Sequence, residues 1–438
     1  MKENLYSKLI EYSEQGRLAM HMPGHKRAGA SMVNPYEIDI TEIDGFDNLH
    51  NPEGIIKEEQ ERLAKIYGSE RAYILVNGST CGNLAAMYAV LSRGDKVVIP
   101  KGAHKSVYNA VEVTGAEPLF FEDIFEKNIK EGFKKSVDVS GIKAVVVTSP
   151  DYNGYVLDIE AIAKAVHDAG AVLIVDSAHG AHLGFSKYFP ENPIKQGADA
   201  VIMSLHKTLP ALTQTSALLI NGNRIDRFRL EHAIDIFETS SPSYVLMSSA
   251  SICMDFLEEQ GATGFDEYAK RLRDFYDKSK GLSRLEIIDL PTDKKDPSKI
   301  IISGKKSRIP GFLIAKMLRE DYKIEPEMTS KFEVLALSSV VDDEKVLDTL
   351  LDAIFDMDKK LSCYDDREFE IAYVACIKQF EQKVGSVSKN MVTIYPPGSP
   401  ILMPGDIVTD DKARKIADAV AYKLDVTGLS SMGDLIVK

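Results

Sequence analysis

Short apolar runs alternate with helical patterns over the first half of the chain, and this alternation constrains the fold more than any other feature. Runs of this length predict buried strands, and the segments between them carry apolar residues at helical spacing. We expect strands at residues 72–76, 96–100, 144–148, 171–175, 200–203 and 216–220, and helices at residues 83–91, 105–113 and 158–169. Continuous apolar strands separated by helices predict an α/β fold, with a mainly parallel sheet covered on both faces.

The pattern changes after about residue 260, where charged helical segments and an α+β arrangement replace the earlier alternation. A chain of 438 residues is also long for a single core. We therefore expect three parts, which are an N-terminal arm or loop segment (residues 1–50), a large domain (51–260) and a smaller C-terminal α+β domain (261–438). In the last part we expect helices near residues 265–279, 310–319, 343–357 and 410–424, and strands near 323–327 and 332–337.

An aspartate and a lysine stand where two of the expected strands end. Asp176 directly follows the run 171–175, and Lys207 comes shortly after the run 200–203. Pyridoxal phosphate (PLP), an aldehyde with a pyridine ring, needs both groups, because the lysine forms an imine and the carboxylate keeps the ring nitrogen protonated. A helix N-cap or a salt bridge would also account for Asp176, but an acidic group after buried apolar residues is costly unless it is partnered. The pair therefore predicts a PLP site.

Other polar side chains also lie just after the carboxyl ends of expected strands, which is where ligands bind in parallel sheets. They are Ser79, Thr80, His104, His179, Ser204 and His206. The turn at residues 77–83 lies between a strand and a helix, and its N–H groups would attract phosphate, although a simple N-cap explains its hydroxyl residues equally well. His104 could lie against a pyridine ring, whereas a lone histidine more often satisfies local hydrogen bonds. The sequence has no P-loop or dinucleotide-binding glycine motif after a strand.

Composition excludes several classes of function. The net charge of −13 argues against nucleic acid as a partner and is compatible with a cationic small substrate. No apolar run is long enough to span a bilayer, and the N-terminus lacks the layout of a secretory signal, so we expect a cytoplasmic protein without a membrane partner. The four cysteines show no metal-type spacing, and we expect thiols rather than disulfides or a metal site.

Five motifs follow one another in order along the chain. They are Met-Pro-Gly-His-Lys at 22–26, Asn-Gly-Ser-Thr at 77–80, Asp-x-Ala-His-Gly at 176–180, Ser-x-His-Lys-Thr at 204–208 and Tyr-Pro-Pro-Gly at 395–398. Together they resemble the ornithine/lysine/arginine decarboxylases of PLP fold type I, the aspartate aminotransferase-like superfamily, over nearly the whole chain. Large members of that family carry an N-terminal wing domain. Because the first motif comes so early here, we expect a short form without that domain and no decamer.

The resemblance implies roles for individual residues. Lys207 would bind the cofactor as an imine, Asp176 would pair with the pyridine nitrogen, and His104 would stack on the ring. Further cofactor-binding residues would be Gly78, Ser79, Thr80, His179, Ser204 and His206. Thr239 matches the position from which a hydroxyl of the neighbouring subunit reaches the phosphate, which implies a homodimer with shared active sites.

The implied activity is PLP-dependent decarboxylation of a basic amino acid in polyamine metabolism. We favour arginine, which would give agmatine and carbon dioxide, with lysine or ornithine as alternatives. Lys207 or His206 would return the proton to the α carbon, and Glu327 is our candidate for binding the cationic end of the substrate, although an exposed strand-end glutamate would look the same. The rival enzymes are an aminotransferase or another PLP lyase on the same fold. An aminotransferase usually clamps the substrate carboxylate with an arginine, and we find none in a matching motif. A non-catalytic PLP-fold binding protein would have lost Lys207 or Asp176.

Overall fold

The computed structural model describes residues 4–27, 32–120, 141–363, 367–395 and 399–438. Most of the Tyr-Pro-Pro-Gly motif, residues 396–398, lies outside the described residues. No described helix is both long enough and apolar enough to cross a bilayer.

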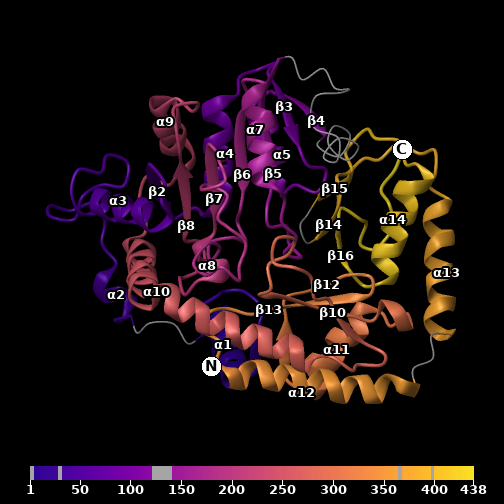
Figure 1. Ribbon diagram of the computed structural model, residues 1–438. Helices are drawn as coiled ribbons and strands as arrows, with labels where there is room; N and C mark the ends of the chain where they lie inside the picture. The colour runs from indigo at the N-terminus through magenta and orange to yellow at the C-terminus, as the bar shows by residue number, and fades with distance from the viewer. Residues whose placement is uncertain (1–3, 28–31, 121–140, 364–366, 396–398) are drawn as a thin grey trace.

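A seven-stranded sheet forms the centre of the N-terminal half (Figure 1). Its spatial order is β2 (Arg71–Leu75), β8 (Ser216–Ile220), β7 (Ala200–Met203), β6 (Val172–Asp176), β5 (Ile142–Thr148), β3 (Lys96–Ile99) and β4 (Glu117–Phe120). Strand β8 runs antiparallel to both neighbours, and the other pairings are parallel. The prediction of a mainly parallel α/β sheet is confirmed, and the structure adds β4, which the sequence analysis missed.

Alternating side chains of these strands enter two different cores. Leu173 and Val175 belong to one hydrophobic cluster, whereas Val172 and Ile174 belong to another on the opposite face. The period of two follows from the geometry of a strand. Helices α3 (Ile55–Tyr67) and α7 (Ile159–Asp168) contribute side chains to the first cluster. Helices α4 (Gly78–Val90), α5 (Lys105–Thr114) and α9 (Arg227–Phe237) contribute to the second. The sheet is therefore covered on both faces, which is why most residues of its central strands are apolar.

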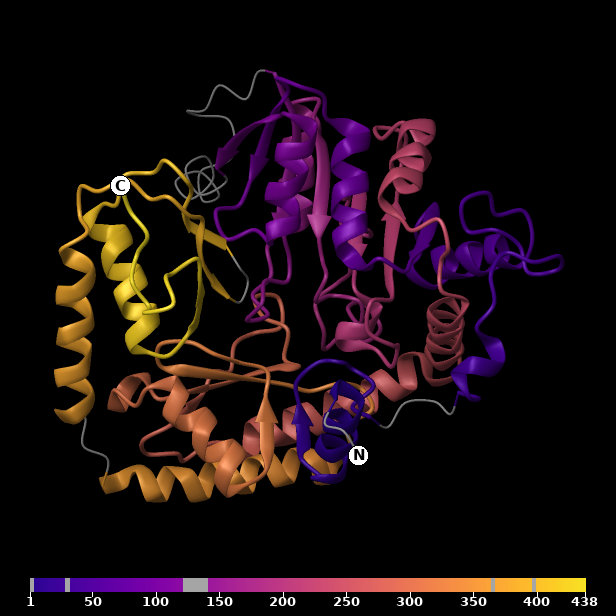
Figure 2. The same cartoon turned by 180° about the vertical axis from the view of Figure 1, so that it is seen from behind.

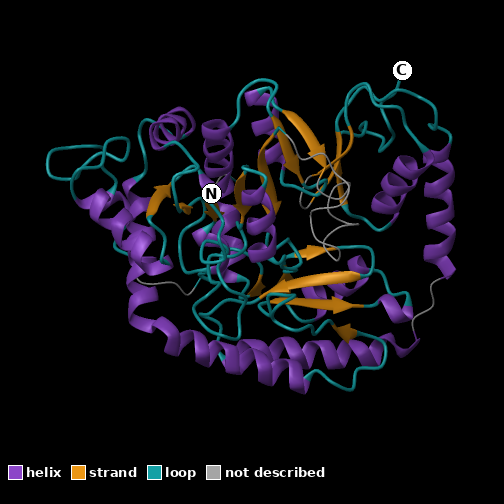
Figure 3. Cartoon of the chain, turned by 45° about the horizontal axis from the view of Figure 1, so that its top comes forward, coloured by secondary structure: helices purple, strands orange, loops and turns teal. Residues whose placement is uncertain are grey.

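A second, antiparallel sheet lies beyond one end of the large sheet (Figures 1 and 3). Its order is β12 (Met328–Thr329), β13 (Glu333–Leu337), β10 (Lys299–Ser303) and β9 (Glu286–Ile287), and it packs with α10 (Tyr244–Lys278), α11 (Gly311–Asp321) and α12 (Glu344–Lys360). Helix α10 is kinked at Gly261, whose φ is +43°. The expected domain boundary at residues 260/261 coincides with this kink and stays a prediction, since the core of this sheet is continuous with one core of the large sheet.

The C-terminal region has a small core of its own. Helices α13 (Arg367–Glu381) and α14 (Asp410–Ala421) flank a three-stranded sheet of order β15 (Ser399–Leu402), β14 (Val392–Tyr395) and β16 (Asp425–Thr427). The predicted helix at residues 410–424 is present, but the sequence analysis did not expect this separate sheet.

The N-terminal arm is more regular than the sequence suggests. Helix α1 (Leu5–Glu14) begins with a capping box between Asn4 and Ser7, and β1 (Leu18–Met20) pairs in parallel with β11 (Ile324–Pro326). Figure 2 shows the arm beside the second sheet. A short helix α2 (Pro35–Ile38) follows. The expectation of an irregular segment is thus wrong for α1 and β1, because a partner strand distant in sequence stabilises β1.

Candidate active site

Lys207 lies at the carboxyl edge of the large sheet, where β7 passes directly into the single turn α8 (Leu205–Thr208). In Figure 1, α8 lies between this edge and the second sheet. The Lys207 Nζ atom is 3.2 Å from His179 Nε2. Burial lowers the pKa of Lys207, and the charges of Asp176 and Glu327 partly oppose this effect. A lowered pKa increases the fraction of neutral amine, the form that acts as a nucleophile.

Asp176 is the last residue of β6, and the residue is only 2% exposed. Its Oδ2 accepts a hydrogen bond of 2.9 Å from Asn83 Nδ2, and its Oδ1 accepts one of 3.1 Å from the Ala178 N–H. Each carboxylate oxygen has a second lone pair for another donor. The structure therefore holds a buried carboxylate that is suited to bind a protonated ring nitrogen.

His104 is close to both predicted key residues. Burial lowers its pKa, the charge of Asp176 raises it, and the charge of Lys207 lowers it. His104 is also the N-cap of α5, where its Nδ1 accepts a hydrogen bond from the Ser106 N–H at 3.2 Å. His104 therefore makes the local hydrogen bond that a lone histidine usually makes and also lies in the cluster. Its stacking on a ring stays a prediction.

His179 joins this cluster to the second sheet. Its Nδ1 is 2.7 Å from the Nζ atom of Lys299, and its ring centroid is 4.6 Å from that of Tyr152. Burial, followed by the charges of Lys207 and Lys299, lowers the pKa of His179 well below its usual value. A neutral imidazole is therefore expected at neutral pH.

Glu327 is part of the same arrangement. Its Oε1 accepts a hydrogen bond of 2.5 Å from the Tyr152 hydroxyl, and its Oε2 accepts one of 2.8 Å from the Met22 N–H. Its charge opposes the lowering of the pKa of Lys207. The structure thus brings Glu327 to the site from the loop between β11 and β12, although it leaves a role in substrate binding as a prediction.

The start of α4 forms the other end of the candidate site. Ser79 and Ser204 approach each other with 3.0 Å between their Oγ atoms, and Gly78 has a φ of +73°, a conformation that favours glycine. The side chain of Asn77, the N-cap residue, makes no capping hydrogen bond to α4. The N–H groups of the first helical turn and two hydroxyls at a helix N-terminus suit a phosphate. Thr80, in the same turn, is exposed.

His206 points its Nδ1 at the Thr215 carbonyl oxygen, 2.8 Å away. A carbonyl can only accept, so this nitrogen carries the proton. Burial lowers the pKa of His206 to about 4, an effect that the Thr215 hydrogen bond opposes and the charge of Lys207 strengthens.

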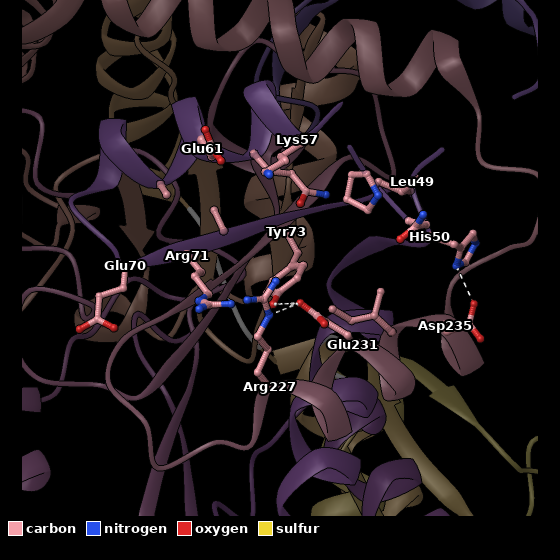
Figure 4. A pocket seen from close by; sticks show the side chains of 16 residues that line it. Leu49, His50, Lys57, Glu61, Glu70, Arg71, Tyr73, Arg227, Glu231 and Asp235 are labelled. Carbon is pink, nitrogen blue, oxygen red and sulfur yellow. Dashed lines mark hydrogen bonds and ion pairs between the residues drawn. The ribbon is translucent and has the colours of Figure 1, made fainter. Parts of the chain in front are cut away.

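Thr239 makes its described contacts elsewhere. Its carbonyl oxygen lies 2.7 Å from His50 Nε2, and His50 Nδ1 lies 3.0 Å from Asp235 Oδ1. His50 and Asp235 line a pocket between α3, β2 and α9 (Figure 4). None of the described residues that line this pocket belongs to the cluster around Lys207. The cross-subunit role of Thr239 stays a prediction.

Three residues of the site were missed by the sequence analysis, namely Asn83, Tyr152 and Lys299. Tyr152 follows the carboxyl end of β5, so the strand-end rule that found Asp176 also applies to it. Asn83 lies in the turn that was singled out for its hydroxyl groups. Lys299 has no such signal, because it begins an apolar strand of a different sheet.

Solved structures with the same fold include the constitutive lysine decarboxylase of Escherichia coli, with a TM-score of 0.69 and 20% sequence identity, where the match covers 88% of this chain and 74% of that one. Lysine decarboxylase A of Pseudomonas aeruginosa matches with a TM-score of 0.71 and 17% identity, over 99% of this chain and 79% of the other. An alanine–glyoxylate aminotransferase of Nostoc also matches, with a TM-score of 0.58 and 12% identity, over 78% of this chain and 94% of that one. The fold is therefore that of the PLP-dependent enzymes of fold type I.

The family model described as "Orn/Lys/Arg decarboxylase, major domain" matches residues 3–295. The chain belongs to this family. A protein of Bacillus subtilis strain 168, YaaO, described as uncharacterized, is 30% identical, with coverage of 98% of this chain and 96% of the relative. A protein of Bacillus anthracis named arginine decarboxylase is 29% identical, with coverage of 98% and 95%.

Proposed function

We propose that this chain is a PLP-dependent decarboxylase of a basic amino acid, and that its preferred substrate is arginine. The observation that carries the proposal is the cluster at the carboxyl edge of the large sheet, where a buried lysine amine, a buried carboxylate and two histidines come together. Family membership supports the reaction class. Full-length relatives named arginine decarboxylase support the choice of arginine over lysine or ornithine.

The residues fit the cofactor. When bound, PLP supplies an aldehyde that links covalently to an amine and a pyridine ring that takes up the electrons of the breaking bond. Lys207 would hold it covalently, Asp176 would keep the ring nitrogen protonated, and His104 would contact the ring. The phosphate would bind the first turn of α4, at Gly78, Ser79 and Thr80, together with Ser204 and His206. His179 would stay hydrogen-bonded to Lys207.

The proton inventory favours Lys207 as the group that returns a proton to the α carbon. His206 has a pKa of about 4, so it is neutral at pH 7, and its one proton is committed to the Thr215 carbonyl. It therefore has no free acidic proton to give. Lys207 has an amine nitrogen that can hold and transfer one.

Glu327 would bind the cationic end of the substrate. Its carboxylate is already oriented by Tyr152 and by the Met22 N–H, and a carboxylate held in this way can accept two parallel hydrogen bonds from a guanidinium. The negative net charge of the chain would also favour the approach of a cationic amino acid. We further propose that the protein is a cytoplasmic homodimer in which Thr239 reaches the phosphate of the neighbouring subunit.

The test is incubation of the purified protein with PLP and, separately, arginine, lysine or ornithine, followed by identification of the amine by mass spectrometry. We expect agmatine from arginine. Lys207→Ala should abolish turnover and the borohydride-reducible link to the cofactor, whereas Lys195→Ala, at an exposed lysine, should change neither. Formation of a 2-oxo acid instead of an amine would favour an aminotransferase, and no product from any substrate would refute the decarboxylase proposal.

A further inference from the structure

The ring of His179 contacts a lysine amine at each of its two nitrogens. Nε2 lies 3.2 Å from Lys207 Nζ, and Nδ1 lies 2.7 Å from Lys299 Nζ. His179 is 5% exposed, and Lys299, the first residue of β10, is completely buried. Because water has little access to these groups, the three must satisfy one another's hydrogen bonds.

A count of protons limits the states that this arrangement can adopt. A neutral imidazole has one N–H donor and one nitrogen acceptor, whereas an ammonium group has only donors. The protonated ring nitrogen can donate only to an amine that has a free lone pair. One of the two lysines is therefore neutral whenever both contacts of neutral His179 are hydrogen bonds.

The geometry indicates which lysine is charged. The 2.7 Å contact of Lys299 has the length of a charge-assisted hydrogen bond, and the 3.2 Å contact of Lys207 is longer. Burial lowers the pKa of Lys299 to about 8, and the charge of Lys207 lowers it too, while the charges of Asp296, Glu327 and Asp151 oppose this. A group with this pKa is mainly an ammonium at pH 7.

The other titratable groups around the triad act on Lys207 and His179. Asp176 and Glu327 favour a charged Lys207, against the larger effect of burial. His104 and His206 add to the charges that disfavour a protonated His179. When His179 is neutral and Lys299 is charged, Nδ1 accepts the hydrogen bond from Lys299. The single N–H proton of the ring then lies on Nε2 and points at Lys207.

We propose that Lys299 is a positioning residue of the active site, whose ammonium donates to His179 Nδ1, fixes the ring in its Nε2–H tautomer and so keeps Lys207 as a neutral amine. The role of this amine rests on the proposed function, in which Lys207 attacks the aldehyde of PLP. The second sheet thus supplies a group that prepares the lysine of the large sheet for reaction.

Lys299→Met tests the proposal, because methionine retains the length of the side chain and removes the charge. In the full-length protein without cofactor, the pH dependence of Lys207 labelling by an amine-reactive reagent is followed by peptide mass spectrometry. We expect the midpoint to rise by about one pH unit, so that labelling of Lys207 at pH values below the wild-type midpoint falls by up to about tenfold. Lys295→Met is the matched control, since Lys295 is also buried but donates to the backbone carbonyls of Asp296 and Lys299. It should leave the midpoint unchanged.

A second measurement uses the wild-type side chains. Nitrogen-15 NMR of the histidine rings distinguishes the two tautomers, and His179→Gln identifies the signals of His179. We expect the Nε2–H form. The Nδ1–H form, an unchanged midpoint in Lys299→Met, or an equal shift in Lys295→Met would each overturn the proposal. If Lys299→Met does not fold, the tautomer of His179 measured in the wild-type protein alone tests the proposal. Neither measurement uses PLP, so failure of the cofactor to attach to Lys207 would refute the proposed function separately.

Discussion

Gly24 should be essential for holding the N-terminal motif against the segment that carries Lys207. A Cβ atom at this position would lie 2.7 Å from the Leu209 nitrogen and 2.7 Å from the Thr208 carbonyl carbon. Both are backbone atoms, which cannot rotate away. The Gly24 N–H also donates to the His206 carbonyl at 2.8 Å, and its own carbonyl accepts a hydrogen bond of 2.6 Å from Ser339 Oγ.

Gly24→Ala can be accommodated in two ways. If the loop moves away, the two hydrogen bonds are lost, at a cost of about 0.5–1.5 kcal/mol each. If the loop stays, overpacking costs about 1–3 kcal/mol. Either route lowers the free energy of unfolding by about 1–3 kcal/mol. Since one side of the contact directly follows Lys207, both routes should also weaken covalent attachment of PLP.

Urea denaturation followed by circular dichroism measures the first effect, because the chain has no tryptophan for fluorescence. Borohydride trapping of the cofactor measures the second. Gly102→Ala is the control, since no atom lies within 4 Å of its added Cβ, and its effect should stay within about 0.5 kcal/mol. A Gly24→Ala protein that matches wild type in both assays would refute the proposed role of this contact.

Burial raises the pKa of Asp296, but His182 and other partners outweigh this effect and hold the pKa at about 2. Because this is below the usual carboxyl pKa, the carboxylate should add about 2 kcal/mol to the free energy of unfolding above about pH 4, and this contribution should be lost as the pH falls towards about 2. In urea denaturation, the difference in free energy of unfolding between wild type and Asp296→Asn should therefore shrink between pH 6 and pH 3. A difference that stays constant would contradict this. In steady-state assays, Glu327→Gln should raise the KM for arginine about tenfold and the KM for norleucine little. The control Glu325→Gln, which affects a surface ion pair, should change neither KM. An unchanged KM for arginine in Glu327→Gln would assign binding of the cationic end of the substrate to another residue. If a Thr239 variant alone is impaired, mixed dimers of this variant and Lys207→Ala should regain activity, because one of their two sites is intact. No recovery after subunit exchange would argue against shared sites.

The large sheet could be predicted because its strands are buried on both faces, so each appears in the sequence as an unbroken apolar run. Six of the seven strands were found in this way. The missed strand β4 (Glu117–Phe120) begins with an exposed glutamate and an exposed proline, so it shows no continuous apolar run, and it lies at the edge of the sheet. The arm strand β1 depends on a partner distant in sequence, and such a pairing leaves no local pattern.

The candidate site was predictable to the extent that it lies on this sheet. Asp176 and Lys207 could be found because the carboxyl ends of parallel strands meet at one edge. Lys299 could not, since its position beside His179 depends on how the second sheet packs against the first. Nothing in the sequence near Lys299 distinguishes a buried active-site lysine from an exposed one at the start of a strand.

Segments that are distant in sequence therefore determine the charges in the cluster. The Met22 N–H binds Glu327 across 305 positions, and Lys299 binds His179 across 120. Buried charges are tolerated only when fixed partners compensate for the loss of water, and the partners of Glu327 and His179 come from other parts of the chain. A local motif can predict which side chains gather at the edge of the sheet. Their protonation states, on which the proposed chemistry depends, are properties of the assembled fold.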